Sequence, residues 1–127
     1  MPYHCVAKVQ RALNDAGRAV KGARIAVFGV SYKPGVGDVR ESPALKILEL
    51  LTEFGAEISY HDPHVPSLHE FGLQSVGVEQ ALKDADLALI VTAHPSVDHE
   101  LVARRARIVV DLRGVTRGSG VANVVRL

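Results

Sequence analysis

Hydrophobic residues follow two alternating patterns along this chain. Short runs rich in β-forming residues occupy positions 24–30, 57–61, 87–92 and 107–111, and the first run reads Arg-Ile-Ala-Val-Phe-Gly-Val. Runs of this length that are dominated by Val, Ile and Leu are typical of strands buried on both faces of a sheet. We therefore expect four strands at these positions.

Between these runs, apolar residues recur every three or four positions, as they do on the buried face of a helix. The first such stripe extends over residues 3–20, and Gly17 is placed to end the helix. Two shorter helices are expected at 78–84 and 97–104.

The clearest helix begins at Ser42-Pro43. Serine is a strong N-cap, and proline is favoured in the first turn because its missing N–H needs no partner there. Gly55 is placed to end this helix as the residue after the C-cap.

The order of the elements predicts the fold class. Strands alternate with helices, which indicates right-handed crossovers and an α/β fold: a Rossmann-like, three-layer parallel sheet with helices on both faces. The first helix precedes the first strand, so we interpret it as the end of a long connecting helix. Segments 31–41, 64–76 and 114–127 contain glycine, proline or polar residues and are expected to be loops.

Composition agrees with one domain of this class. The 127 residues, 47% hydrophobic and 5% aromatic, suffice for one domain but not two. The 15 Lys and Arg nearly balance the 14 Asp and Glu, so no bulk charge predicts nucleic acid or an acidic membrane as a partner. No apolar run approaches the ~20 residues of a membrane span. The single cysteine, Cys5, fits a reducing cytoplasm.

Candidate chemistry lies after the expected strands, because ligands of open α/β sheets bind at the carboxyl ends of the strands. Segment 31–41 combines glycines with Lys33 and Arg40 and leads into a helix N-terminus, which suits a phosphorylated ligand. The segment matches neither Gly-x-Gly-x-x-Gly nor a P-loop. It equally suits a loop whose charges are solvated and paired with one another. Arg113 follows the fourth strand and lies either in the same crevice or on the surface.

Asp62 follows the second strand, where dinucleotide-binding folds place an acid that binds ribose. Proline comes next, and an Asp-Pro turn capped by the carboxylate is the better interpretation. Cys5 lies on the expected first helix and is interpreted as a packing or exposed helix residue rather than a nucleophile.

The histidines raise a metal hypothesis. One group comprises His61 and His64, and another comprises His94 and His99. Neither group has His-x-x-x-His spacing on a helix or a Cys-x-x-Cys partner, so we expect turn and surface roles and no metal site.

Three stretches carry a resemblance to a known family. They read YKPGVGDVRESPA at residues 32–44, LKDADLALIVTAHPSVD at 82–98 and VVDLRG at 109–114. With these stretches, of which the first is the most specific, the chain resembles the C-terminal domain of the UDP-glucose/GDP-mannose dehydrogenase family over about residues 1–117. Residues 1–21 resemble the end of that family's central helix, which joins two Rossmann-like domains and forms dimer contacts.

The resemblance implies a domain boundary and a set of ligand residues. Residues 22–127 would form a Rossmann-like domain that binds a UDP-sugar. Tyr32, Lys33 and Arg113 would contact the nucleotide sugar, and Arg40 would reach toward NAD bound by the N-terminal domain. The implied reaction oxidises the C6 alcohol of the sugar to a carboxylate with two NAD⁺.

The chain also departs from the family pattern. It lacks the Gly-x-Gly-x-x-Gly domain and any match for the catalytic cysteine, which in the family lies upstream of the central helix. We therefore expect a domain with no catalytic residue of its own, inactive without an N-terminal NAD-binding domain. The Tyr-Lys-Pro and Glu-Ser-Pro-Ala motifs resemble those of the bacterial UDP-N-acetylhexosamine dehydrogenases more than those of the UDP-glucose enzymes. The alternatives are a stand-alone nucleotide-binding module and a dimerisation domain.

Overall fold

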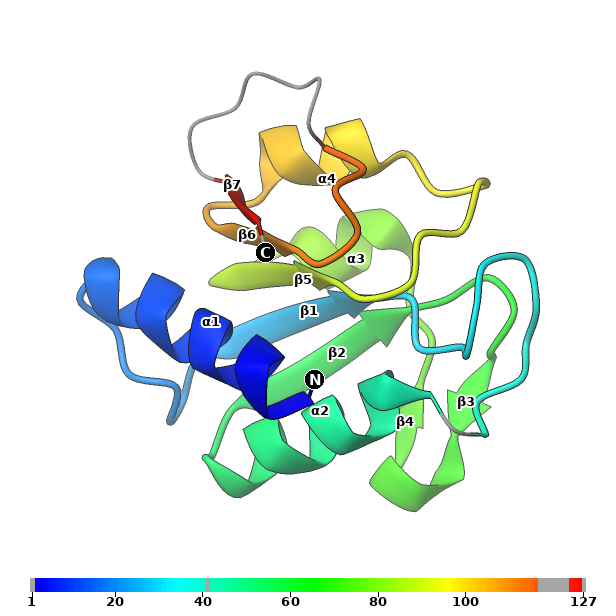
Figure 1. Cartoon of the computed structure of the whole chain (residues 1–127), viewed down its shortest axis with the longest axis horizontal. Coiled ribbons are helices and arrows are strands. Elements are labelled where there is room, and N and C mark those ends of the chain that lie inside the picture. The colour runs from blue at the N-terminus through cyan, green and yellow to red at the C-terminus, as the bar shows by residue number, and fades with distance from the viewer. Residues whose placement is uncertain (1, 41, 117–123, 127) are drawn as a thin grey trace.

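A parallel sheet of five strands forms the centre of the molecule (Figure 1), in a computed structural model that describes residues 2–40, 42–116 and 124–126. The strand order is β2-β1-β5-β6-β7, and every neighbouring pair is parallel. This confirms the α/β, Rossmann-like fold predicted from the sequence. The strands are β1 (Arg24–Phe28), β2 (Glu57–His61), β5 (Leu87–Ile90), β6 (Val109–Asp111) and β7 (Val124–Arg126).

Helices cover both faces of the sheet, and the alternation of side chains along each strand divides the core between them. Ile25 and Val27 of β1 face α1 (Pro2–Asp15) and α2 (Pro43–Glu53). Ala26 and Phe28 face α3 (Val78–Leu82) and α4 (His99–Arg105) on the other side. Because both faces are buried, these strands read in the sequence as continuous apolar runs.

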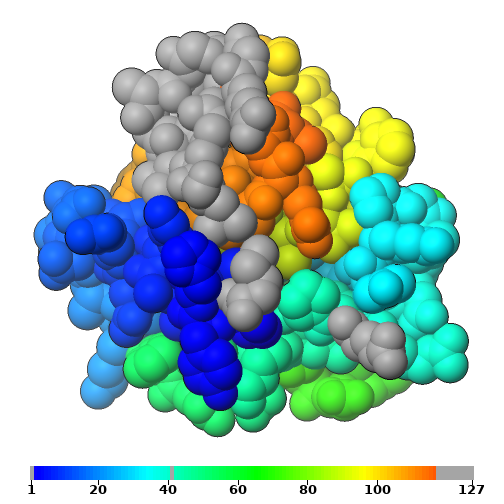
Figure 2. Space-filling model, in the orientation of Figure 1, coloured from blue at the N-terminus to red at the C-terminus, as the bar shows by residue number. Residues whose placement is uncertain are grey.

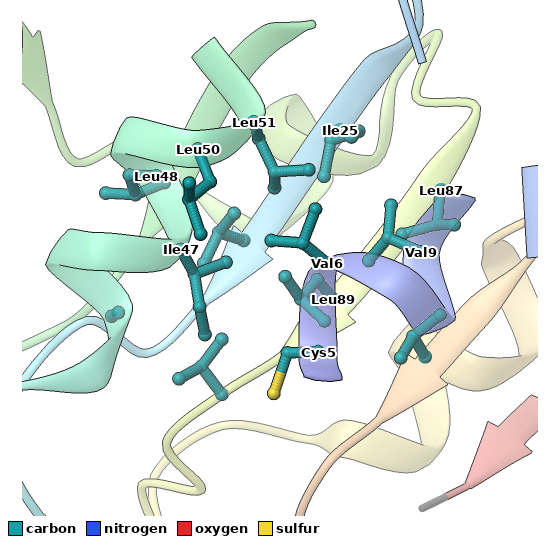
Figure 3. Close-up of a cluster of buried hydrophobic side chains, with 14 of the residues drawn as sticks. Cys5, Val6, Val9, Ile25, Ile47, Leu48, Leu50, Leu51, Leu87 and Leu89 are labelled. Carbon is teal, nitrogen blue, oxygen red and sulfur yellow. The ribbon is translucent and has the colours of Figure 1, made fainter. Parts of the chain in front are cut away.

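The larger core layer joins α1 and α2 to the sheet (Figure 3). Val6 and Val9 of α1 point toward Leu51 of α2 and toward Leu87 and Leu89 of β5. Burying side chains of this size stabilises the fold by about 1.5–3 kcal/mol each, so α1 is an integral part of this core. None of the helices within the described residues combines the length and apolar character that a membrane crossing requires.

The ends of α2 confirm the signals in its sequence. The Ser42 hydroxyl accepts a hydrogen bond from the Ala44 N–H (3.2 Å) and donates one to the Val30 carbonyl (2.8 Å). This N-cap therefore also fixes the start of α2 to the segment that follows β1. At the other end, Gly55 adopts a φ of +90°, and its N–H donates to the Thr52 carbonyl in a Schellman-type stop.

Segment 64–76 was expected to be irregular and is instead partly ordered. It contains a small antiparallel pair, β3 (Ser67–Leu68) and β4 (Leu73–Gln74), joined by a 3₁₀ turn, η1 (His69–Phe71). The buried Tyr60 hydroxyl anchors it by donating to the Val65 carbonyl over 2.9 Å. Strands of two residues leave too short a pattern in the sequence to be recognised.

The expectation of a loop over 114–127 is wrong for its end. Residues 124–126 form β7 and pair with β6 in the register Val109↔Val124. This strand was not predicted because it has only three residues, Val-Val-Arg, and follows a glycine-rich stretch. Residues 117–123 and 127, to which the same expectation applied, lie outside the described part of the chain.

Candidate functional site

The order of strands reverses direction between β1 and β5. From β1 the chain passes to β2 on one side and later returns to β5 on the other side of β1. At such a switch point the loops diverge and leave a crevice beyond the carboxyl ends of the strands, where ligands of α/β proteins bind. The two loops here are residues 29–40, called the β1 loop, and residues 91–98, called the β5 loop. Figure 2 shows the cyan β1 loop on the surface beside the yellow β5 loop.

The first residues of the β1 loop pack closely against the β5 loop. Gly29 has a φ of +85°, and an added Cβ would overlap the backbone carbonyl of Thr92. The Thr92 hydroxyl donates a hydrogen bond to the Ser31 carbonyl over 2.8 Å. Only glycine tolerates both this conformation and this contact.

Asp62, at the carboxyl end of β2, forms hydrogen bonds with both loops. Its Oδ2 accepts hydrogen bonds from the N–H groups of Val30 (2.8 Å) and Ser31 (3.1 Å). Its Oδ1 accepts from the His64 N–H over 2.8 Å, which is the Asp-Pro turn expected from the sequence. Burial raises the pKa of Asp62, but these N–H donors together with His94 outweigh it and leave the pKa below its usual value. The carboxylate is thus structural, and it is 2% exposed.

Tyr32 and the charged side chains of the β1 loop are exposed. Tyr32 is 49% exposed and Lys33 is exposed, and Lys33 forms no ion pair with any described residue. Arg40 is exposed too, but its guanidinium donates two hydrogen bonds to Asp38, of 3.1 Å from Nε and 3.0 Å from Nη2. This contact holds the pKa of Asp38 below its ordinary value. Of the loop charges, Arg40 is thus paired with Asp38, whereas Lys33 is exposed to solvent.

Arg113 lies on the same edge, after β6. Its Nε donates to the Val91 carbonyl over 2.6 Å, which fixes the side chain beside the β5 loop. The buried Asp111 carboxylate orders this turn by accepting from the N–H groups of Arg113, Gly114 and Thr116. Burial raises the pKa of Asp111, but the hydrogen bonds, above all those from Thr116, outweigh burial and leave the pKa below its usual value.

The topology brings Lys33 and Arg113 to one edge of the sheet. They follow β1 and β6, with β5 between these strands. At about 4.8 Å per strand, the two segments emerge about 10 Å apart. Two cations on one edge of the sheet suit an extended dianionic group such as a diphosphate.

One histidine, His94, differs from the expectation of turn and surface roles. His94 is fully buried, at 0% exposure, in the β5 loop, where both ring nitrogens have partners. Burial lowers the pKa of His99, and its Nε2 has no hydrogen-bond partner among the described residues. Within the described ranges, no three His, Cys, Asp or Glu side chains gather where they could hold a metal ion. The sequence offered one signal for His94, its position just after a buried strand.

Cys5 lies on α1 in the larger core layer, with its sulfur among apolar side chains (Figure 3). It is 0% exposed, and burial raises the pKa of its thiol. A buried thiol with a raised pKa is a poor nucleophile, in agreement with its interpretation as a packing residue.

Comparison with known proteins identifies the family to which this chain belongs. The family model described as the UDP binding domain of the UDP-glucose/GDP-mannose dehydrogenase family matches residues 26–118. The chain belongs to the UDP-glucose/GDP-mannose dehydrogenase family. The match includes the β1 loop, the β5 loop and Arg113, and it corresponds to the C-terminal, UDP-binding domain expected from the sequence.

Relatives with curated names agree with this assignment. The chain is 32% identical over 131 residues to the UDP-N-acetyl-D-mannosamine dehydrogenase of Pyrococcus horikoshii, and the match covers 99% of this chain and 30% of that protein. It is 38% identical over 90 residues to the UDP-glucose 6-dehydrogenase of Bacillus subtilis, covering 66% of this chain and 20% of that protein.

The solved structures show the same domain within a larger protein. The structure of the Pyrococcus horikoshii UDP-D-ManNAc dehydrogenase superposes with a TM-score of 0.73 at 32% identity, and covers 87% of this chain and 26% of that one. The chain thus spans about a fifth to a third of the length of the curated relatives that it matches.

Proposed function

We propose that this chain is the nucleotide-sugar-binding domain of an NAD-dependent UDP-sugar 6-dehydrogenase. In such an enzyme the C6 alcohol of the sugar is oxidised to a carboxylate, with two NAD⁺ reduced per turnover. The observation that carries the proposal is the match of residues 26–118 to the UDP binding domain of the family. That match covers the carboxyl edge of the sheet at the switch point, where the exposed Lys33 and Arg113 are proposed to bind a diphosphate.

Three residues are proposed to bind the substrate. The Lys33 ammonium has no competing ion pair among the described residues, so it is available to the diphosphate. Among the described residues, the Arg113 guanidinium bonds only the Val91 carbonyl, through Nε, so its two terminal nitrogens are available for a bidentate contact with phosphate oxygens. Tyr32 exposes its ring beside Lys33 and offers a face and a hydroxyl to the nucleotide sugar.

NAD would be held mainly by a separate N-terminal domain. This chain contains no Gly-x-Gly-x-x-Gly segment, and what it offers the cofactor is the exposed guanidinium of Arg40. A guanidinium that binds one carboxylate through two N–H groups has the geometry to bind a phosphate instead. NAD⁺ supplies the hydride acceptor, and Arg40 would help to neutralise its phosphates after release from Asp38.

The names of the relatives extend the proposal to partners and location. Most of the matched relatives act on UDP-N-acetyl-D-mannosamine or UDP-glucose by name, which supports a UDP-sugar as the substrate class. In the whole enzyme we expect a homodimer that uses the connecting helix, to which α1 would belong. A single, buried cysteine is consistent with a cytoplasmic enzyme of polysaccharide biosynthesis.

Calorimetric titration of the chain with UDP tests the proposal. UDP is expected to bind, and Lys33→Ala and Arg113→Ala are each expected to weaken binding about 10- to 100-fold, which corresponds to the loss of a hydrogen bond to a charged group. Lys83→Ala and Arg104→Ala are the matched controls, because these exposed residues belong to α3 and α4 regions outside the crevice. The controls should bind UDP as the unsubstituted chain does.

Two results would count against the proposal. Absence of UDP binding would favour a dimerisation domain, the alternative from another class, which light scattering would then reveal as a stable dimer. UDP binding that is equally weakened by the site and control variants would indicate non-specific attraction of an anion to a basic surface.

A further inference from the structure

His94 occupies the switch point between β1 and β5 with both ring nitrogens engaged. Its Nε2 lies 2.9 Å from Oδ2 of Asp62 and 3.1 Å from the hydroxyl of Ser31. Its Nδ1 lies 3.0 Å from the backbone nitrogen of Gly35, in the middle of the β1 loop. The side chain is 0% exposed, and the ring of His64 lies beside it with 4.7 Å between centroids.

These partners define the protonation state of the ring. A backbone N–H can only donate, so Nδ1 must accept from Gly35 and carry no proton. The Asp62 carboxylate, whose pKa lies below its usual value, can only accept, so Nε2 must carry the proton. His94 is therefore the neutral Nε2–H tautomer, a donor toward β2 and an acceptor toward the β1 loop.

The bond to Gly35 reaches the part of the loop that other anchors do not. Asp62 fixes the beginning of the loop at Val30 and Ser31. Farther along, the Tyr32 N–H donates to the Asp38 carbonyl over 2.6 Å, which closes the loop on itself without attaching its tip to the core.

The same network also fixes the residue before the tip. The Ser31 hydroxyl, 3.1 Å from Nε2 of His94, donates to the Lys33 carbonyl over 3.0 Å. The backbone around Lys33 is thus attached to the His94 network on both sides, through its own carbonyl and through the N–H of Gly35.

We infer that His94 is a positioning residue for the nucleotide site: its neutral imidazole holds the β1 loop at Gly35 and so presents Lys33 to the diphosphate. The second half of this inference rests on the proposed function, whereas the first half, the anchoring of the loop, does not. His94 touches no ligand in this scheme and acts through the backbone on either side of Lys33.

Two substitutions separate the two bonds of the ring. In His94→Asn, an amide oxygen on Cγ takes the place of Nδ1 and can accept from Gly35, but the shorter side chain does not reach Asp62. In His94→Gln, the amide nitrogen at the ε position can donate to Asp62, and no acceptor remains at the δ position for Gly35. A merely structural histidine would make both variants equally defective at the loop.

The test makes two measurements on each variant. The first is the rate of amide hydrogen exchange at Gly35 relative to the rate at Leu89, in the central strand β5. The second is the affinity for UDP. We expect exchange at Gly35 to accelerate relative to Leu89 in His94→Gln, with about tenfold weaker UDP binding. In His94→Asn, protection of Gly35 and UDP affinity should stay within about threefold of the unsubstituted chain, even if the protein is less stable overall. Equal behaviour of the two variants at Gly35 would overturn the inference.

A measurement on the unsubstituted chain covers the case in which a variant does not fold. The ¹⁵N shifts of the His94 ring should show a protonated Nε2 and an unprotonated, hydrogen-bonded Nδ1 at neutral pH, and a proton on Nδ1 would refute the anchor to Gly35. If the unsubstituted chain has this tautomer and a protected Gly35 but does not bind UDP, the proposed function fails while the anchoring role stands.

Discussion

The Asp62 carboxylate provides a sharp test of how the site is built. Asp62→Asn replaces a group with two acceptor oxygens by an amide with one. If the amide oxygen takes the place of Oδ2, it keeps the hydrogen bonds from the N–H groups of Val30 and Ser31. The NH₂ group then faces the His64 N–H, and because both are donors, the His64 N–H loses its acceptor. An unsatisfied buried donor costs about 1–3 kcal/mol, and the remaining bonds lose their charge assistance. We expect the free energy of unfolding to fall by about 3 kcal/mol at pH 7.

The effect should also depend on pH with a defined sign. The folded protein holds the pKa of Asp62 below its usual value, which is about 3.9 in an unfolded chain. A lowered pKa contributes stability that is present above the unfolded value and is lost as pH falls through the folded value. The variant has no such group, so its deficit should be constant from pH 7 to about pH 5 and should shrink below about pH 4.

Urea unfolding followed by circular dichroism, at several values from about pH 7 to about pH 3, measures both quantities. Asp15→Asn is the matched control, because Asp15 is exposed at the end of α1 and should change stability by no more than about 0.5 kcal/mol. A deficit for Asp62→Asn of less than about 1 kcal/mol at pH 7 would refute the reasoning. So would a deficit that stays the same at every pH.

Three further predictions concern the close contact between the loops, the buried thiol and catalysis. Gly29→Ala should lower the free energy of unfolding by at least about 2 kcal/mol in thermal unfolding, because Gly29 has a positive φ and lies against the Thr92 carbonyl. Gly77→Ala, with open space around it, is the control and should cost no more than about 1 kcal/mol. Similar losses for both variants would contradict the close contact at Gly29. Cys5 should not react with a disulfide reagent in the native protein and should react as one thiol in guanidinium chloride; fast native reaction would contradict its burial. With a UDP-sugar and NAD⁺, the chain alone should produce no NADH, and any turnover abolished by Cys5→Ser would contradict the assignment of Cys5 as a packing residue.

The helices and strands could be predicted from the sequence wherever the run of apolar residues was long enough to show a helical or strand-like spacing. The Ser42-Pro43 cap, the Gly55 stop and the apolar strands were all recognised, because each depends on local chemistry. The pair β3–β4 and the strand β7 were missed, since strands of two or three residues carry no period. Helix α1 ends at Asp15, five residues earlier than its apolar stripe suggested, because the turn at Gly17 already terminates it.

The positions of the candidate residues in the fold could be predicted, but their contacts could not. The rule that ligands bind beyond the carboxyl ends of the strands placed Lys33, Arg40 and Arg113 on the edge where they lie. That Arg40 pairs with Asp38, while Lys33 pairs with no described residue, depends on the conformation of a loop without periodic structure. His94 was assigned to a turn because its partners, Asp62 and Gly35, are 32 and 59 residues away in the sequence.

The proposed function requires that UDP bind at the switch point of the sheet. A titration of the ¹⁵N-labelled chain with UDP, followed residue by residue in amide spectra, tests this requirement. We expect saturable shifts confined to the β1 loop, the β5 loop and the residues around Arg113. An absence of shifts, or shifts centred on the opposite edge around Arg24 and Lys83, would contradict it.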